Sequence, residues 1–205
     1  MTAERSPCAG EPRTWGAASL VSSIKSARPG FQQFARLPRG GPRARHCRRG
    51  VRREPEFTLS EAYPDETFGR LVDLAAAHTG RERDEIVFEL GVFTGETTFP
   101  RLYPAFYAEA GSARAFLLTV ETRIHELVRA TIPQAGPPQL AIAPREDGVT
   151  ISYESPRRLC VLLRGLTEGT ARHYGQHAEV GEETCMLRDD PTCTFEVVFS
   201  DGSPL

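Results

Sequence analysis

The stretch Tyr153-Glu154-Ser155-Pro156-Arg157 carries a phenol, a hydroxyl and a guanidinium at alternate positions. On an extended segment, residues at i, i+2 and i+4 point to the same face. That face suits carboxylates, because an arginine fork can pair with them bidentately while the two hydroxyl groups add donors. A purely local interpretation competes with this one. In it Ser155 caps a helix, Pro156 takes the first helical position and Arg157 lies in a solvated first turn.

A histidine, His125, precedes this stretch on a segment with helical periodicity. The apolar residues around it form one stripe, which comprises Phe116, Leu117, Val120, Ile124, Leu127 and Val128. His125 lies off the edge of that stripe, where a lone helical histidine is often only a half-buried residue. A neutral imidazole is also a natural iron ligand. Iron on one side and carboxylates on the other describe a haem with its two propionates.

The chain resembles the haem nitric oxide/oxygen-binding (H-NOX) family, the sensor domain of soluble guanylate cyclase and its bacterial relatives. The resemblance covers roughly residues 63–199 and rests on short motifs in a fixed order. These motifs are Tyr63-Pro64-Asp65, Phe99-Pro100-Arg101-Leu102, Ile124-His125-Glu126-Leu127-Val128, the Tyr-x-Ser-x-Arg stretch, Gly165-Leu166-Thr167-Glu168-Gly169, His173-Tyr174-Gly175, Cys185-Met186-Leu187 and Cys193-Thr194-Phe195-Glu196-Val197. It implies a stand-alone sensor of the bacterial type, with an atypical N-terminal region.

The resemblance assigns roles to particular residues. The residue matching His125 is the only protein ligand of the iron in the family, and those matching Tyr153, Ser155 and Arg157 hold the propionates. Pro138 matches a proline that presses on the porphyrin and distorts it. Haem b is therefore the implied cofactor, with nitric oxide or another diatomic gas as its ligand. Strong ligand binding opposite the histidine can weaken or break the histidine bond, which is a two-state switch of the kind that signalling needs.

The choice of gas is predicted from one position. Oxygen-binding relatives hold dioxygen with a tyrosine on the helix after the triplet, and the matching residue here is Leu162. A leucine cannot donate a hydrogen bond, and the remaining residues predicted on that face are also leucines. The resemblance therefore favours nitric oxide over oxygen.

Three late cysteines, Cys160, Cys185 and Cys193, form a second constellation. Some bacterial members of the family carry a zinc site with this spacing and a histidine three residues before the middle cysteine, where this chain has Glu182. Zinc accepts carboxylate oxygen, so the fourth ligand is Glu182, a nearby His177 or water. A reversible Cys185–Cys193 disulfide is the redox alternative, and three ordinary buried cysteines are the simplest one.

Composition limits the remaining classes of function. Residues 1–55 hold twelve basic and three acidic residues, whereas the rest of the 205 residues hold 13 basic and 24 acidic ones. An acidic body argues against nucleic acid as a partner. No run of 18 apolar residues is present, which argues against a membrane span, and an odd number of cysteines suits the cytoplasm. Residues 1–55 are expected to be a disordered, basic segment, with a nucleic-acid-binding arm as the weaker alternative and a frame-shifted reading as another, and residues 56–200 the sensor domain.

Periodicity predicts an α+β fold, with helices first and an antiparallel sheet later. Asp65 is expected to cap a helix that ends near His78, and Ser112 to start the long helix that carries His125. The other expected helices are one containing Ile86, Val87 and Leu90, one over about 99–110 and one over about 156–174, in which Gly165 and Gly169 allow close approach. The expected strands contain Leu140 and Ile142, then Val149, Ile151 and Tyr153, then about 177–186 and 194–199.

Three functions compete at this point. The first is a haem-based sensor that signals to a separate protein, a histidine kinase or a diguanylate cyclase as in bacterial relatives. The second is a haem-free zinc/thiol redox switch or interaction module with the same fold. Enzymatic activity is the weakest, because the chain shows no nucleophile–base pair, no carboxylate dyad at useful spacing and no phosphate loop.

Overall fold

The computed structural model describes residues 14–15, 63–132 and 135–202. Apart from Thr14–Trp15, the basic segment 1–55 lies outside the described residues, so the structure does not test the expectation that this segment is disordered. Thr14–Trp15 (β1) pairs antiparallel with Tyr63–Pro64 (β2). None of the described helices is long and apolar enough to cross a membrane.

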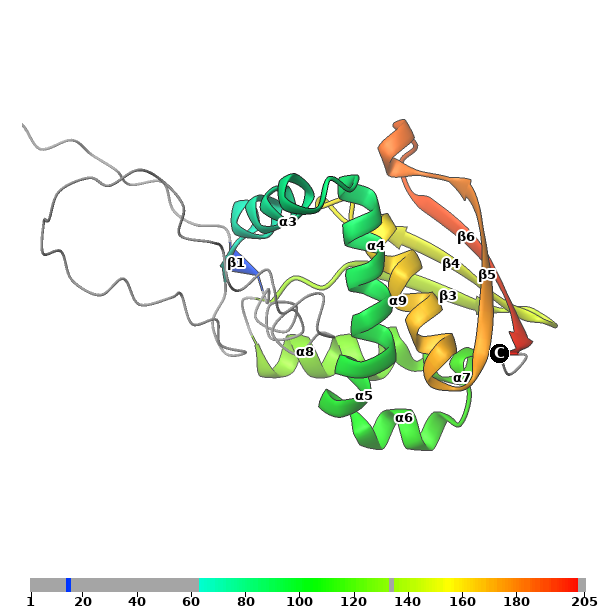
Figure 1. Ribbon diagram of the computed structural model, residues 1–205. Helices are drawn as coiled ribbons and strands as arrows, with labels where there is room; N and C mark the ends of the chain where they lie inside the picture. The colour runs from blue at the N-terminus through cyan, green and yellow to red at the C-terminus, as the bar shows by residue number, and fades with distance from the viewer. Residues whose placement is uncertain (1–13, 16–62, 133–134, 203–205) are drawn as a thin grey trace, which may run out of the picture.

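The expected α+β architecture is confirmed (Figure 1). The helical part comprises α3 (Asp65–Thr79), α4 (Arg83–Phe93), the π-helix η2 (Thr94–Thr98), α5 (Phe99–Leu102), α6 (Pro104–Ala110), α7 (Ala113–Thr119), the π-helix η3 (Val120–His125) and α8 (Glu126–Thr131). After it come β3 (Gln139–Pro144), β4 (Gly148–Glu154), α9 (Cys160–His173), β5 (Gln176–Thr184), the 3₁₀ turn η4 (Met186–Arg188) and β6 (Cys193–Asp201). The four long strands form one antiparallel sheet in the order β3-β4-β6-β5.

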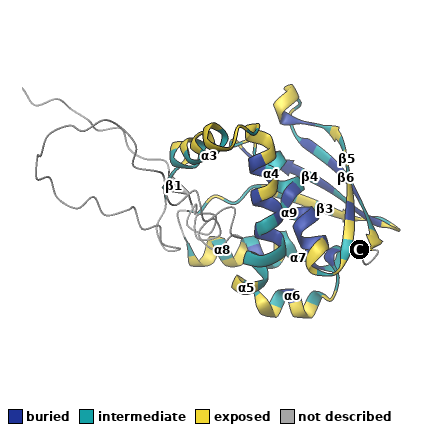
Figure 2. Cartoon of the chain, viewed as in Figure 1, coloured by how far each residue is buried: buried dark blue, intermediate teal, exposed yellow. Residues whose placement is uncertain are grey.

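Helix α9 packs between α4 and the sheet, and glycines set its distance from α4 (Figures 1 and 2). A Cβ added to Gly165 would lie 2.1 Å from the carbonyl oxygen of Phe88, and one on Gly169 would lie 2.1 Å from that of Val92. From the other side, a Cβ added to Gly91 in α4 or to Gly95 in η2 would lie 2.5 Å from a backbone carbonyl oxygen of α9. The two backbones therefore touch directly, which confirms the close approach expected from the sequence.

The helical segment that carries His125 is continuous but not uniform. Ser112 caps it as expected, because its side chain accepts a hydrogen bond from the backbone N–H of Ala115 at 3.2 Å. The π-helix η3 follows α7 and inserts an extra residue into the turn. Beyond it the expected apolar stripe holds at Val128, which lines the cavity, but not at Leu127. Leu127, expected on the apolar stripe, is 39% exposed.

Three predicted helix boundaries were wrong. The helix expected from residue 156 begins at Cys160, because Arg158 takes a left-handed conformation (φ 50°) that an α-helix cannot include. Phe99 continues the helical run that begins at Arg83, and the break comes at Tyr103, just before Pro104. The residue before α3 is Pro64, so Asp65 is the first helical residue and not its cap.

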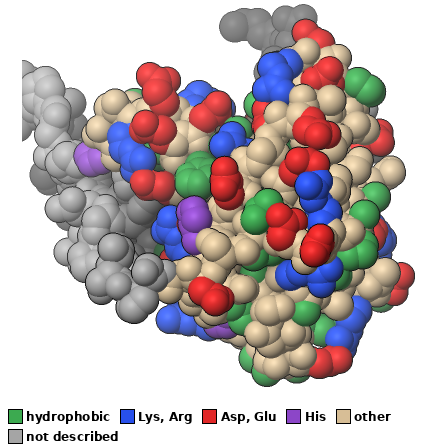
Figure 3. Space-filling model, turned by 90° about the vertical axis from the view of Figure 1, so that its right-hand side faces the viewer, with side chains coloured by type: hydrophobic (Ala, Val, Ile, Leu, Met, Phe, Trp, Pro, Cys, Tyr) green, Lys and Arg blue, Asp and Glu red, His purple; other side chains and the backbone are tan. Residues whose placement is uncertain are grey.

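The core lies between the sheet and the helices (Figure 2). Its fully buried members come mostly from β4 and β6, and include Val149, Ile151, Phe195 and Val197. Strand β5 forms one edge of the sheet, and its exposed positions include Glu179 and Glu183. Charges on an edge strand discourage pairing with other chains. Acidic and basic side chains are interspersed over the face turned to the viewer in Figure 3.

Candidate haem site and cysteine cluster

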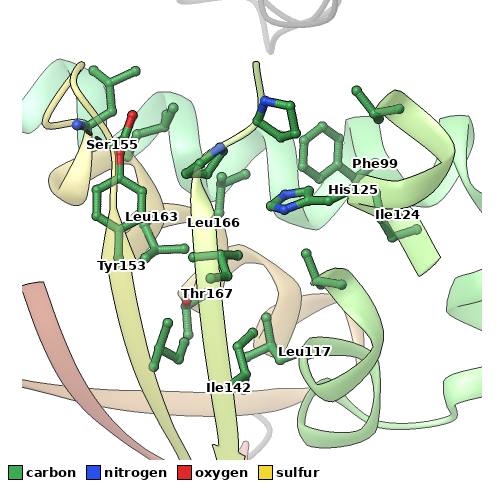
Figure 4. Close-up of a pocket in the computed structure, with 18 of the residues that line it drawn as sticks. Phe99, Leu117, Ile124, His125, Ile142, Tyr153, Ser155, Leu163, Leu166 and Thr167 are labelled. Carbon is green, nitrogen blue, oxygen red and sulfur yellow. Dashed lines mark hydrogen bonds between the residues drawn. The ribbon is translucent and has the colours of Figure 1, made fainter. Parts of the chain in front are cut away.

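A cavity opens between the His125 helix, strands β3 and β4, and helix α9 (Figure 4). Its wall is almost entirely apolar. The lining includes Phe99, Phe116, Leu117, Val120, Ile124, Val128, Ile132, Pro137, Pro138, Leu140, Ile142, Ile151, Leu159, Leu162, Leu163 and Leu166. Figure 4 shows His125 on one side of the cavity, and Tyr153 with Ser155 on the other.

His125 contributes a largely buried imidazole, with 13% of its side chain exposed. Its Nδ1 lies 2.6 Å from Oε2 of Glu121, one turn earlier. Burial lowers the pKa of His125, and this outweighs the carboxylate of Glu121, which raises it. The ring is therefore neutral at pH 7. With the proton on Nδ1 facing Glu121, the lone pair of Nε2 is left to bind a metal.

Tyr153 and Ser155 are buried and line the cavity, as the alternating pattern predicts. The phenol oxygen of Tyr153 accepts a hydrogen bond from the backbone N–H of Leu159 at 3.0 Å. Burial raises the pKa of Tyr153, and hydrogen bonds with Ser155 and Leu159 only partly oppose this. The phenol of Tyr153 therefore stays protonated, as a donor to a carboxylate must.

Arg157 does not share that face, which corrects the one-face prediction. Strand β4 ends at Glu154, and Pro156 and Arg157 form a turn. The guanidinium of Arg157 donates from Nε to both carboxylate oxygens of Asp65 at 3.1 Å, and from Nη1 to the carbonyl oxygen of Gly136 at 3.0 Å. Gly136 itself lines the cavity, so Arg157 lies at its rim.

The side of the cavity formed by α9 is less uniform than predicted. Leu162 is buried and lines the cavity as expected. Thr167 and Thr170, which also line it, were missed, although they lie one helical turn beyond Leu163 and Leu166. Tyr103 is a further phenol in the lining, and no sequence pattern singled it out.

The three late cysteines meet at the start of α9 and at the facing ends of β5 and β6. Their sulfur atoms all lie within 4.8 Å of one another, with Cys160 Sγ 3.7 Å from Cys185 Sγ, and Cys193 Sγ 4.0 Å from Cys185 Sγ. All three are buried, and their thiols are free. Burial raises the pKa of Cys160 to about 12, with the hydrogen bond from Cys185 adding to the effect.

The structure brings neither proposed fourth ligand into this cluster. The carboxylate of Glu182 accepts a hydrogen bond from Arg188. Nδ1 of His177 lies 3.3 Å from Oε1 of Glu168, at the other end of β5. The described group that could hold a metal consists of the three cysteines alone.

The sequence matches the haem-NO-binding (HNOB) family over residues 46–182. This is more than half of the chain, which therefore belongs to the H-NOX family. Homologues in this family are haem-based gas sensors, and H-NOX domains are sensor domains rather than enzymes. No curated protein matches the chain.

Solved structures agree on the fold. The chain is similar to an H-NOX protein from S. oneidensis in the Fe(II)NO state, with a TM-score of 0.73, 16% identity, and coverage of 90% of this chain and 99% of that one. It is also similar to an unliganded Fe(II) H-NOX protein from K. algicida, with a TM-score of 0.64, 17% identity, and coverage of 91% of this chain and 89% of that one. A third similar structure is an oxygen-binding H-NOX domain related to soluble guanylate cyclases, with a TM-score of 0.64, 19% identity, and coverage of 92% of this chain and 94% of that one. At these identities the likeness supports the fold alone.

Proposed function

We propose that this chain binds haem b in the described cavity, senses nitric oxide there and signals to a separate protein. The observation that carries the proposal is a neutral imidazole, that of His125, in a largely apolar cavity. Such a cavity suits the porphyrin, and the donor set suits its substituents, with Nε2 of His125 for the iron and two buried hydroxyl groups for the propionates. Bound haem would supply an iron with one coordination position open to a gas.

The residues of this chain would divide the work of holding that group. His125 would be the iron ligand, and Tyr153 and Ser155 would donate to a propionate from the opposite side of the cavity. Arg157, at the rim, would pair with a propionate while also contacting Asp65 and Gly136. Pro138 would press on the porphyrin from the loop before β3.

Nitric oxide is the proposed gas because Leu162, which lines the cavity, stands at the position that matches the oxygen-holding tyrosine of oxygen-binding relatives. Leu162 offers no hydrogen bond, and a bound dioxygen, which carries partial negative charge, needs a donor to hold it. The proposed partner is a histidine kinase or a diguanylate cyclase, and the proposed compartment is the cytoplasm, where the free thiols stay reduced.

The test is an absorption spectrum of the full chain expressed with added haem precursor. A Soret band is expected, and the ferrous protein should take up nitric oxide and carbon monoxide without forming a stable oxygen complex. Leu162→Tyr should then create an oxygen complex. A protein that carries no haem would refute the proposal, and a stable oxygen complex in the unmodified protein would refute the choice of gas.

A zinc or thiol site is the second candidate function, supported by the three clustered sulfur atoms. With Glu182 and His177 engaged elsewhere, a zinc ion would take water or an exogenous ligand as its fourth ligand. The carboxylate of Asp190 lies beside the cluster, since it accepts a hydrogen bond from the backbone N–H of Cys185 at 2.7 Å. Metal analysis of the purified protein decides this, and a haem-free, zinc-loaded protein would favour the second candidate.

A further inference from the structure

A three-member chain of side chains ends on the imidazole of His125. Oε2 of Glu121 contacts Nδ1 of His125 at 2.6 Å, and its other oxygen, Oε1, accepts from Nη2 of Arg129 at 2.6 Å. The side chains of Glu121 and Arg129 are 30% and 42% exposed, against 13% for the imidazole. The network therefore runs from solvent to the cavity wall.

The three residues are four apart in sequence, so one helical face brings them together across η3 and α8. The other arginine on that turn, Arg123, is turned to Glu109 at 2.8 Å and to the ring of Phe106. Arg129 is thus the cation that neutralises Glu121.

Glu121 is placed to act as a carboxylate anion. Its Oε1 accepts a hydrogen bond from the guanidinium of Arg129 at 2.6 Å, and a cation at that distance favours the charged form of a carboxyl group. An ionised carboxylate only accepts hydrogen bonds, so Nδ1 of a neutral His125 must be the donor.

We infer that Glu121 is a positioning residue that fixes the tautomer of His125 and strengthens its Nε2 as an iron ligand, with Arg129 tempering the effect. The inference rests on the proposed haem function. A carboxylate that accepts the Nδ1 proton raises the basicity of the other ring nitrogen, and it holds the ring in one orientation. A cation on the same carboxylate withdraws part of that electron density. Arg129 and Glu121 should therefore act in opposite directions.

Four variants of the full chain separate this electronic role from a structural one. Glu121→Gln keeps an acceptor but removes the charge, and Glu121→Ala removes both. Arg129→Gln leaves Glu121 without its cation. Glu126→Gln is the matched control, since Glu126 is an exposed acid on the same helical run and, among the described residues, forms no ion pair with Arg129.

In the ferrous, haem-loaded protein, the iron–histidine stretching frequency should fall from wild type to Glu121→Gln and further to Glu121→Ala. It should rise in Arg129→Gln and stay unchanged in Glu126→Gln. The reduction potential should move the opposite way, upward for the Glu121 variants. Haem affinity should drop on the order of 10-fold in Glu121→Ala. A shift of the same sign in Arg129→Gln and Glu121→Gln, or none in either, would overturn the inference.

A measurement without haem keeps the two proposals apart. Nitrogen NMR of the haem-free chain, labelled at histidine, should show His125 with its proton on Nδ1 in wild type and a mixture of tautomers in Glu121→Ala. The Nε2-protonated form in wild type would overturn the inference even if haem binds. Absence of a Soret band in wild type would instead remove the iron-ligand half of the inference together with the proposed function.

Discussion

The cavity and the cysteine cluster both bury side chains that can bind a metal, but burial has opposite consequences for metal binding at the two places. Burial disfavours charge at both places, so it lowers the pKa of His125 and raises that of Cys160. The uncharged imidazole already has the lone pair that a metal needs, whereas the uncharged thiol must first lose a proton. In its protonation state the buried imidazole could therefore coordinate a metal as it stands, and we call it the prepared site; the buried thiols could not, and we call them the idle site.

The sharpest test of the prepared site is His125→Ala. The substitution should abolish the Soret band, or make it depend on added imidazole, because the described cavity lining contains no second histidine. His177→Ala is the control, since that side chain is exposed and pairs with Glu168. An unchanged absorption spectrum in His125→Ala would end the assignment.

The idle site makes a prediction about reactivity. With its pKa raised to about 12, the Cys160 thiol of the zinc-free protein should react with iodoacetamide at pH 8 roughly a thousandfold more slowly than an ordinary exposed thiol. Raising the pH should increase the rate, and denaturation should restore it. Mass spectrometry of the alkylated peptides measures this.

Zinc should reverse the protonation of the cluster. Binding would release protons from the thiols, which a titration in weak buffer detects, and affinity should fall as the pH falls. Rapid alkylation of Cys160 in the native, zinc-free protein would show that the contrast between the two sites is wrong.

A substitution at the rim of the cavity should change haem binding by a smaller factor than the loss of His125. Arg157→Ala removes a guanidinium that would pair with a propionate, and a charge-assisted hydrogen bond is worth roughly 1.5–3 kcal/mol. Transfer of haem to an acceptor protein should therefore become about 10–100-fold faster. Arg158→Ala is the control, because its exposed side chain lies 3.9 Å from Asp189 and away from the cavity. Equal effects of the two substitutions would rule out a specific role for Arg157.

The smallest effect is expected where α9, which links the two sites, packs on α4. Gly165→Ala would place a methyl group 2.1 Å from the carbonyl oxygen of Phe88, and the required shift should cost about 1–3 kcal/mol of unfolding free energy. Gly69→Ala is the control, since a Cβ there meets nothing within 4 Å and alanine favours a helix by about 0.5–1 kcal/mol. Urea denaturation compares them, and equal midpoints would argue against backbone contact.

Local patterns predicted most of the elements, and the failures have identifiable causes. The cap at Ser112, the sheet and the cavity-facing position of Tyr153 follow from short-range patterns that the sequence records, whereas Leu162 was singled out by the family resemblance. The bond between Arg157 and Asp65 joins residues 92 positions apart, and no local pattern encodes it. Glu182 pairs with Arg188 because the chain turns at η4, and the spacing of residues in the sequence does not reveal that contact either.

The π-helix explains the remaining error around His125. A stripe drawn at a constant period correctly selects Ile124 and Val128 but also selects Leu127 and leaves out His125, whereas the cavity around η3 is lined by Ile124, His125 and Val128. Glu121, absent from the predicted site, lies on the same segment. The i, i+4 spacing of Glu121 and His125 could have revealed it, because such pairs contact on any helix.

Direct backbone contact between α4 and α9 has a mechanical consequence. Ordinary helix pairs meet through side chains, whose rotamers can yield when one helix is pushed. At Gly91, Gly95, Gly165 and Gly169 no side chain lies between the two backbones. A displacement of one helix therefore cannot be taken up by a change of side-chain rotamer. The two helices should therefore move together as one rigid unit. Leucines that line the cavity lie near one end of α9, and the hydrogen bond from the backbone N–H of Ala178 in β5 to Glu168 lies nearer the other end.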